Sequence, residues 1–345
     1  MVTIGDVAQA AGVSRSTASY ALSGKRAISD EVRLRVEDAV RTLGYTPNAG
    51  ARALATSQTM VLALLAQFLP DEFAPAMLQY IMGVSDTARE LGYDILLVTD
   101  EEQAKAIERI TRSRMVDGVV MLNVAEADER LPLLRAARQP AALVGLPHDC
   151  SGVDVFDLDF EEAGRMMVEH LHRLGHRELI LISQPEHVLE RGGAYVWRLQ
   201  DAAVEQARLR GITLHTTFGS AKQPEIGQEV NDLLDAHPAA TGLMINNEAA
   251  VAALPSVLHA RGLSCPDDLS VIGRYSDEFA RTFSLPFSFV EGAPDRLGRM
   301  AVRQLVKRIE STSAAKEPHV VRLLSPEIVD RGSTGAPPAG PRRHG

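Results

Sequence analysis

The chain has 345 residues, of which 45% are hydrophobic and 23% charged, and its formal net charge at pH 7 is −9. This composition is that of an ordinary globular protein with a sizeable core, and the length predicts two or three domains. The longest apolar run, Met60–Ala66, is far shorter than the roughly 20 residues of a membrane-spanning helix, so we expect no membrane partner.

The cysteines and the first residues bear on location and on metal chemistry. The spacing of the two cysteines, Cys150 and Cys265, fits neither a disulfide framework nor a zinc site. The sequence does not open with a basic region followed by an apolar stretch, as a signal peptide would. We therefore expect a cytoplasmic protein without a metal site or a cofactor.

Charge is distributed unevenly along the chain. Residues 1–58 hold seven Lys or Arg and five Asp or Glu, a net charge of +2, which leaves −11 for the rest. A mildly basic head can bind phosphate groups locally while the acidic body stays soluble. The asymmetry permits nucleic-acid binding without identifying it.

The first 45 residues are predicted to form three short helices. Thr3 and Asp6 match a helix-start pattern, and Gly12 ends the helix that follows. Ser14 caps a second helix after a tight turn, and a third helix is expected over residues 30–43. Two helices joined by such a turn form a helix-turn-helix, which either binds DNA or has a purely structural role.

The outward face of the second helix carries side chains that suit DNA contacts. Arg15 can reach phosphate or guanine, and Tyr20 offers a hydroxyl group and an apolar ring. A helix face that is simply solvated would more often carry Glu and Lys. We therefore favour DNA binding, and the predicted contacts in the head are Thr3, Ser14, Arg15, Ser16, Thr17 and Tyr20.

Residues 46–58 are predicted to form a hinge. About two helical turns follow Pro47, and an isolated helix of that length is unstable in water, so we expect it to fold only when something supports it. A plain linker would not need an apolar Leu54 beside Arg52, a combination that minor-groove binders insert into DNA. The predicted DNA contacts in the hinge are Asn48, Ala51, Arg52 and Leu54.

The stretches TIGDVAQAAGVSRSTASYALSG and GYTPNAGARALA, with the spacing between them, resemble the lactose-repressor family of bacterial transcription regulators. The resemblance runs from Thr3 to about Asp330. It implies that the second helix enters the major groove, with Arg15, Ser16 and Tyr20 at the base-contacting positions. It also implies that paired hinge helices bind the minor groove. Many members carry Arg where this chain has Tyr20, so their operator sequence does not transfer.

From residue 59 onward, apolar runs alternate with amphipathic segments. Such alternation predicts parallel sheets covered by helices, and ligands of such sheets bind beyond the carboxyl ends of the strands. The predicted strands lie at 60–67, 94–99, 117–122, 140–145, 177–182 and 240–245, and helical segments at 75–91, 161–174 and 197–209. By resemblance this body is a periplasmic-binding-protein-like effector core with a cleft between two lobes.

The predicted fold is an all-α helix-turn-helix head plus a hinge helix, joined to an α/β core of two doubly wound lobes. The chain is expected to cross between the lobes near residues 158, 288 and 320. The predicted divisions are head 1–45, hinge 46–58, core 59–332, N-lobe about 59–157 and 289–318, C-lobe about 158–288 and 319–332, and tail 333–345.

The tail is rich in Gly, Pro and small residues, so we expect it to be disordered. It has no leucine heptad, so the tetramerisation helix of some family members is not expected here. The predicted assembly is a homodimer.

Effector contacts are predicted mainly from the resemblance. Phe73 follows the first strand and is expected to stack on the ligand. Arg191 and Arg198 compete for the role of the ligand-binding arginine. Asn247 and Tyr275 stand where family members carry acids that accept sugar hydroxyls, so a different sugar, a nucleoside-like ligand or degenerate ligand binding are all open.

Catalytic motifs are not found: the sequence has no Gly-x-Gly-x-x-Gly after a strand, no phosphate-cradling loop and no His-Glu-x-x-His. Asp159 and His176 are expected to have structural roles. We predict a non-enzymatic, sequence-specific regulator, most simply a repressor, that binds a near-palindromic operator as a dimer and responds to a small-molecule effector. The alternatives are a solute-binding protein and an enzyme carrying a DNA-binding head.

Overall fold

The computed structural model describes residues 2–23, 28–45, 58–68, 73–311 and 317–339. The chain forms two compact units, Met1–Thr59 and Met60–Gly345, each with its own core. Among the described helices, none is long and apolar enough to cross a bilayer. The predicted hinge helix and its four predicted DNA contacts lie outside the described residues: Asn48, Ala51, Arg52 and Leu54.

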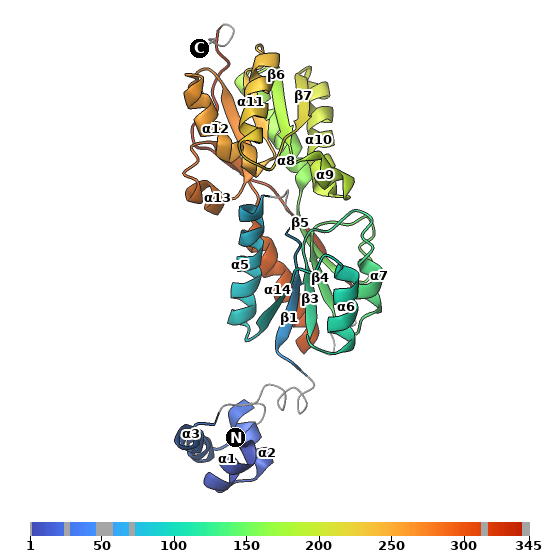
Figure 1. Ribbon diagram of the computed structural model, residues 1–345, viewed down its shortest axis with the longest axis vertical. Helices are drawn as coiled ribbons and strands as arrows, with labels where there is room; N and C mark the ends of the chain where they lie inside the picture. The colour runs from blue at the N-terminus through green and yellow to red at the C-terminus, as the bar shows by residue number, and fades with distance from the viewer. Residues whose placement is uncertain (1, 24–27, 46–57, 69–72, 312–316, 340–345) are drawn as a thin grey trace. The chain divides into compact units, whose positions relative to one another are not determined.

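The first unit contains the predicted helix-turn-helix, followed by a further helix (Figure 1). Thr3 caps the first helix in a reciprocal capping box, in which its backbone N–H donates to Asp6 Oδ2 at 2.7 Å. Gly12 (φ 65°) makes the turn, and Gly44 (φ 61°) ends the last helix. The helices are α1 (Ile4–Ala10), α2 (Arg15–Ser23) and α3 (Asp30–Leu43), and their shared core contains Val7, Ala8, Ala11, Ala18, Val36 and Ala39.

The N-lobe of the second unit is built on a parallel sheet of strand order β11-β5-β4-β3-β1-β2. Helices α5 and α14 cover one face of it, and α6 and α7 cover the other. The strands are β1 (Val61–Leu65), β2 (Asp94–Val98), β3 (Gly118–Met121), β4 (Ala141–Val144), β5 (Asp154–Leu158) and β11 (Val321–Leu324). The helices are α5 (Ala74–Glu90), α6 (Gln103–Arg112), α7 (Leu131–Ala136) and α14 (Pro294–Glu310).

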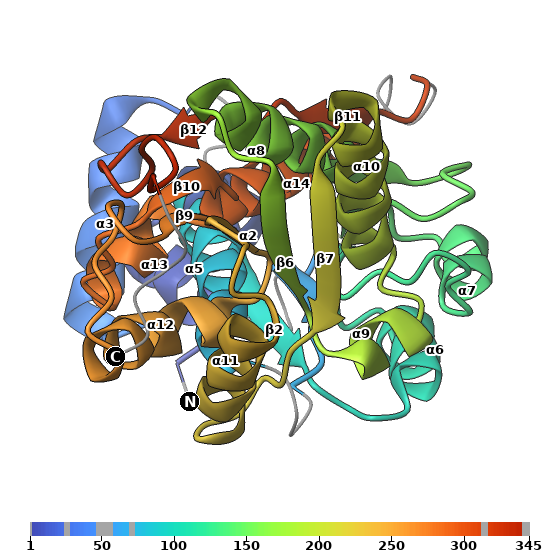
Figure 2. The ribbon, with the colours of Figure 1, turned by 90° about the horizontal axis from the view of Figure 1, so that it is seen from above.

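The C-lobe sheet has the order β12-β10-β9-β8-β6-β7, with only the short β12 antiparallel among the described strands. Figure 2 shows β6 and β7 side by side, with α11 and α12 on the side away from α8. The strands are β6 (Glu178–Ser183), β7 (Thr213–Phe218), β8 (Gly242–Ile245), β9 (Ser270–Tyr275), β10 (Ser288–Glu291) and β12 (Ile328–Val329). The helices are α8 (Phe160–Leu174), α9 (Glu186–Glu190), α10 (Ala194–Arg210), α11 (Glu225–Ala236), α12 (Glu248–Ala260) and α13 (Asp277–Thr282).

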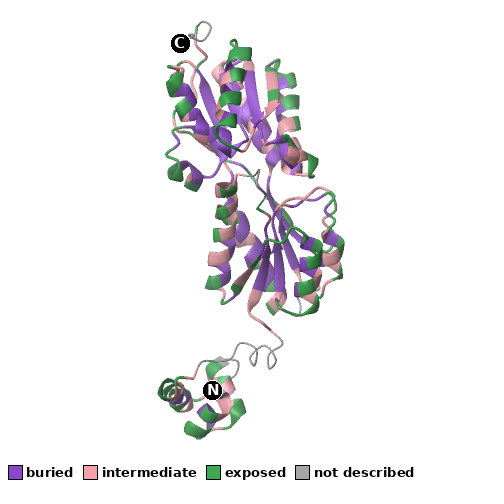
Figure 3. Cartoon of the chain, viewed as in Figure 1, coloured by how far each residue is buried: buried purple, intermediate pink, exposed green. Residues whose placement is uncertain are grey.

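Burial explains why the sequence pattern predicted these sheets. Most strand residues in both lobes are buried, and exposed residues gather on the outer faces of the helices (Figure 3). Strands that are covered on both faces read as continuous apolar runs, which is the pattern of β1, β3, β4 and β8. The predicted doubly wound α/β core is confirmed.

The second and third lobe crossings lie a few residues later than predicted. Strand β10 pairs with β9 of the C-lobe, so the second crossing follows Glu291 instead of lying near residue 288. Strand β11 pairs with β5 of the N-lobe, so the third crossing follows Leu324 instead of residue 320. An apolar run predicts a strand, but the partner of that strand depends on tertiary packing, which the run does not encode.

The predicted disorder of the tail is wrong for residues 333–339. Ser333 is 3% exposed, and its hydroxyl donates to the carbonyl of Val271 at 2.6 Å. The carbonyl of Gly335 accepts from Nε2 of the buried His176 at 3.0 Å, so the structural role of that histidine is confirmed. The composition predicted disorder because the segment has few apolar side chains to bury. Hydrogen bonds of its backbone groups and of one hydroxyl hold it in place instead. The remaining tail residues lie outside the described part of the chain.

Candidate functional site

A cleft of about 720 Å³ lies in the second unit, lined by residues of both lobes. Its N-lobe residues follow the carboxyl ends of β1, β2, β3 and β4, and its C-lobe residues include those after β6 and at the start of α12. The carboxyl ends of parallel strands meet at one edge of a sheet, where open α/β folds bind their ligands. The cleft therefore lies where the effector site was predicted.

Two of the predicted effector contacts line this cleft. Phe73 is one of them, and its ring packs on Phe279 and Phe283, with ring centroids 5.9 and 6.0 Å away. Arg191 lies at the C-terminal end of α9, beside the cleft. Its competitor Arg198 is not among the cleft-lining residues, and its guanidinium lies 5.4 Å from the ring centroid of Trp197.

The other two predicted contacts, Asn247 and Tyr275, are not among the residues that line the cleft, and each is 1% exposed. The Asn247 side chain caps α12, accepting from the backbone of Ala250 at 3.0 Å and donating to the carbonyl of Gly219 at 3.0 Å. The Tyr275 hydroxyl donates to the carbonyl of Phe287 at 2.8 Å. Both polar groups are held by the protein interior, so these two predictions are corrected.

Their immediate neighbours, Glu248 and Arg274, line the cleft instead. Arg274 and Tyr275 are successive residues of β9, so their side chains point to opposite faces of the sheet, and Glu248 begins α12 directly after its N-cap Asn247. Arg274 Nη2 donates to Glu248 Oε1 at 2.7 Å, and its Nε donates to Asn246 Oδ1 at 2.8 Å. Burial alone would lower the pKa of Arg274, but the Glu248 carboxylate outweighs it and the pKa is raised.

An ion pair on the N-lobe side of the cleft is similarly enclosed. Arg130 Nε and Nη2 donate to the two carboxylate oxygens of Asp128, at 2.8 and 2.6 Å, in a bidentate arrangement. Burial would raise the pKa of Asp128, but these bonds from Arg130 outweigh it and the pKa is lowered. Each lobe thus brings a charge pair to the cleft that is already compensated within the protein.

Asp157 differs from the paired carboxylates. It lines the cleft at the end of β5, and burial raises its pKa to about 7, although the backbone N–H groups of Leu146 and Leu158 donate to it at 3.0 and 2.9 Å. Aromatic rings complete the lining, with Phe160 and Tyr195 in contact at 5.3 Å between centroids. The cleft therefore combines apolar surface with a carboxyl group that titrates near neutral pH.

Helix α2 and the Ser14 before it carry the predicted DNA contacts of the head except Thr3, which caps α1. Ser14 caps it, accepting from the backbone of Thr17 at 3.0 Å, and also hydrogen-bonds the hydroxyls of Ser16 and Thr17 at 2.8 Å each. Arg15, Ser16 and Tyr20 are exposed. Sequence reasoning missed Gly5 of α1, where a Cβ atom would lie 2.9 Å from Arg15 Nε. A side chain at that position would displace Arg15.

Comparison with known proteins agrees with this arrangement. Residues 3–48 match the family model of bacterial regulatory proteins of the lacI family, and residues 168–334 match that of the periplasmic binding protein-like domain. The body of the chain thus matches the periplasmic binding protein-like domain, and its head matches the lacI family. Members of this family are DNA-binding transcription regulators, in agreement with the predicted function.

Two lacI-family relatives are named HTH-type transcriptional repressor PurR. The protein from Glaesserella parasuis serovar 5 is 26% identical over 343 residues, and that from Haemophilus influenzae strain Rd is 27% identical over 337 residues. Each match covers 96% of this chain and 98% of the relative. The similarity therefore extends over head, hinge and core together.

Two solved structures of lacI-family regulators are similar over almost the whole chain. The transcriptional regulator CelR in complex with cellobiose is 26% identical, with a TM-score of 0.65 and coverage of 96% of this chain and 100% of that one. The lac repressor dimer bound to operator and the anti-inducer ONPF is 22% identical, with a TM-score of 0.79 and coverage of 97% and 99%. The second likeness shows the fold alone.

Proposed function

We propose that this protein is a lacI-family transcriptional repressor that binds a near-palindromic operator as a homodimer and responds to a small molecule in the cleft. The observation that carries the proposal is the union, in one chain, of a capped helix α2 with exposed Arg15 and Tyr20 and a two-lobed body with a ligand-sized cleft. Such a regulator acts on chromosomal DNA, so we place it in the cytoplasm.

The cleft favours an uncharged polar ligand with an apolar face. The cations Arg130 and Arg274 in its wall are paired with Asp128 and Glu248, so a charged ligand that bound either of them would have to displace an internal partner. Aromatic rings supply flat apolar surface, which suits the faces of a saccharide. The CelR relative, solved with cellobiose, supports a saccharide in this chain as well.

Control of DNA binding requires two states that the ligand favours differently. A ligand that touches both lobes stabilises one relative orientation of the lobes. In the proposed mechanism this orientation changes the spacing of the two heads of the dimer, so that they no longer fit both halves of the operator. The effector thereby releases the operator.

Selection of bound sequences from random DNA, followed by release with a panel of saccharides, tests the proposal. We expect an enriched palindromic sequence, affinity that falls steeply with salt because phosphate contacts are lost, and release by one compound. Arg191→Ala is expected to lose the response to that compound while keeping DNA affinity. Arg208→Ala, at an exposed arginine of α10 outside the cleft lining, is the matched control and is expected to keep both.

The opposite results would refute the proposal. A DNA affinity that does not change between low and moderate salt, or a failure to enrich any sequence, contradicts sequence-specific DNA binding. A compound that is turned over, instead of only raising the melting temperature, would support the enzyme alternative.

A further inference from the structure

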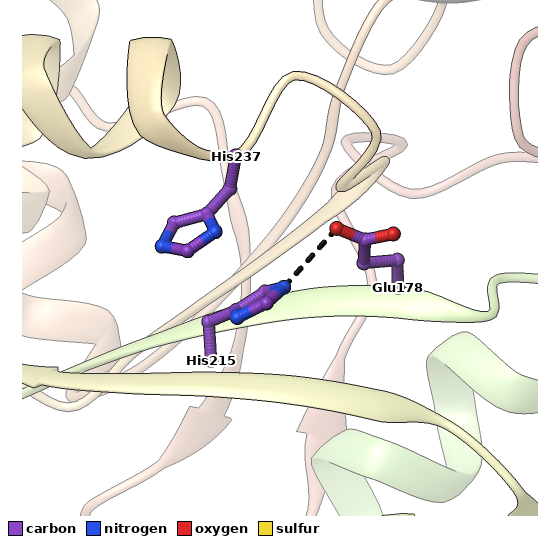
Figure 4. A group of neighbouring side chains, drawn as sticks. All are labelled: Glu178, His215 and His237. Carbon is purple, nitrogen blue, oxygen red and sulfur yellow. Dashed lines mark hydrogen bonds and ion pairs between the residues drawn. The ribbon is translucent and has the colours of Figure 1, made fainter.

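Three potential metal ligands converge in the C-lobe, at the end of the sheet away from the cleft (Figure 4). Glu178 begins β6, His215 lies in β7, and His237 follows the last residue of α11. Ile180 is the register partner of His215, and residues 178 and 180 point to the same face of β6. Glu178 and His215 therefore share the face of the sheet that α11 covers.

The side chains are already close to one another. His215 Nε2 lies 3.1 Å from Glu178 Oε1, and the rings of His215 and His237 stack with centroids 3.8 Å apart. One ligand atom from each residue lies within 4.8 Å of the other two. The side chains of His215 and Glu178 are 28% and 31% exposed, so an ion can enter from solvent and keep a water ligand.

We propose that Glu178, His215 and His237 form a binding site for a divalent transition-metal ion of the Zn²⁺ type. Two imidazole nitrogens and one carboxylate oxygen are a donor set that Zn²⁺ accepts, whereas Mg²⁺ and Ca²⁺ prefer oxygen ligands. Zn–ligand bonds of about 2.0–2.1 Å place tetrahedral ligands about 3.3 Å apart, so closing the site requires side-chain rotations that tilt the stacked rings of His215 and His237 until a nitrogen of each points at the ion. The ion takes the position of the hydrogen atom between His215 Nε2 and Glu178, and the imidazole of His215 carries its one proton on Nδ1 and binds as a neutral ligand.

The surroundings favour a cation at this position. His237 is the C-terminal cap of α11, and its backbone N–H donates to the carbonyl of Leu233 at 3.1 Å. The C-terminal end of a helix carries partial negative charge, which attracts positive charge. Two charged residues next to the site in the sequence already have partners within the protein. Arg177 donates to the carbonyl of His176 at 2.8 Å, and Asp235 forms an ion pair with Arg261.

A bound ion would tie the edge strand β7 and its neighbour β6 to helix α11. These elements belong to different segments of the chain, so the crosslink is expected to stabilise the folded C-lobe by mass action. The three ligands are not among the residues that line the cleft, and the inference does not rest on the proposed effector function.

The test uses the full chain without a histidine tag, treated with chelator and titrated with ZnCl₂ in a calorimeter. We expect one Zn²⁺ per chain and a higher melting temperature with the ion. Loss of an outer hydrogen-bonding partner of a metal ligand typically costs about 10–100-fold in affinity, so His215→Ala is expected to weaken binding at least about tenfold. His259→Ala, at an exposed histidine of α12 in the same lobe, is the matched control and should bind like the wild type.

Three results would overturn the site. These are absence of saturable binding in the wild type, equal weakening by His215→Ala and His259→Ala, and several weak ions per chain with no dependence on His215. If His215→Ala does not fold, Glu178→Gln gives the decision, because it keeps the side-chain shape and removes the anionic ligand. Weaker Zn²⁺ binding by that variant supports the site, and unchanged binding refutes it.

Discussion

Arg274 Nη2 and Glu248 Oε1 lie 2.7 Å apart in the wall of the cleft, and both side chains are only 8% exposed. Gln184 Nε2 donates to the other carboxylate oxygen at 2.6 Å, so Glu248 is held from two sides. An ion pair this buried costs solvation free energy in both partners, and its partners depend on each other. The C-lobe wall of the cleft therefore presents a cation and an anion that are already paired with each other when a ligand binds.

Removing one partner of this ion pair is expected to lower the free energy of unfolding more than replacing both partners with apolar residues. Glu248→Ala leaves the Arg274 guanidinium buried and unpaired, which should lower the free energy of unfolding by about 3 kcal/mol. The double variant Glu248→Leu, Arg274→Met should lose less than Glu248→Ala alone. Urea unfolding of the three proteins measures this. A double variant less stable than either single variant would contradict the interdependence.

Base preference is expected to depend on Tyr20. Its side chain is exposed on α2, where family members often carry Arg, which reads guanine by two hydrogen bonds. Tyr20→Ala should shift or relax the selected DNA sequence while saccharide binding stays intact, and each changed base should alter affinity by about 1–3 kcal/mol. Thermal stabilisation by the effector is the control. An unchanged selected sequence would refute this role.

The sequence predicted most reliably those features that depend on neighbours along the chain. The Thr3–Asp6 helix start and the turn at Gly12 were read from short motifs, and both are present. The buried strands followed from continuous apolar runs, because strands covered on both faces must be apolar throughout. These interactions are local, so a single sequence contains them.

Features that depend on which way a side chain points, or on which distant strand a strand pairs with, were less predictable. The predicted contacts Asn247 and Tyr275 are buried while their neighbours Glu248 and Arg274 line the cleft, because a motif alignment does not say which of two adjacent side chains faces a cleft. Strand β11 was placed in the wrong lobe for a related reason, since its partner β5 is far away in the sequence. The convergence of His215 and His237 involves separate elements, and their spacing matches no short motif.

The tail segment 333–339 is expected to contribute to stability. Deleting residues 333–345 removes the hydroxyl of Ser333 from the buried carbonyl of Val271, and the carbonyl of Gly335 from His176. Each buried polar group left without a partner costs about 1–3 kcal/mol, so the melting temperature should fall by several degrees. Truncation after Ala339 keeps these contacts and is the matched control. Equal melting temperatures for the two truncations would contradict the role of the segment.

The buried Asp157 is expected to make stability depend on pH. Burial raises its pKa to about 7 in the folded protein, whereas an unfolded chain has an ordinary value of about 4. Between these values the folded protein keeps a proton that the unfolded chain has lost, so this carboxyl group costs stability increasingly as the pH rises from about 4 to 7, and fully above 7. Asp157→Asn cannot ionise, so its melting temperature relative to the wild type should be higher at pH 8 than at pH 5. A difference between the two proteins that stays constant from pH 5 to pH 8 would show that Asp157 does not titrate in this range.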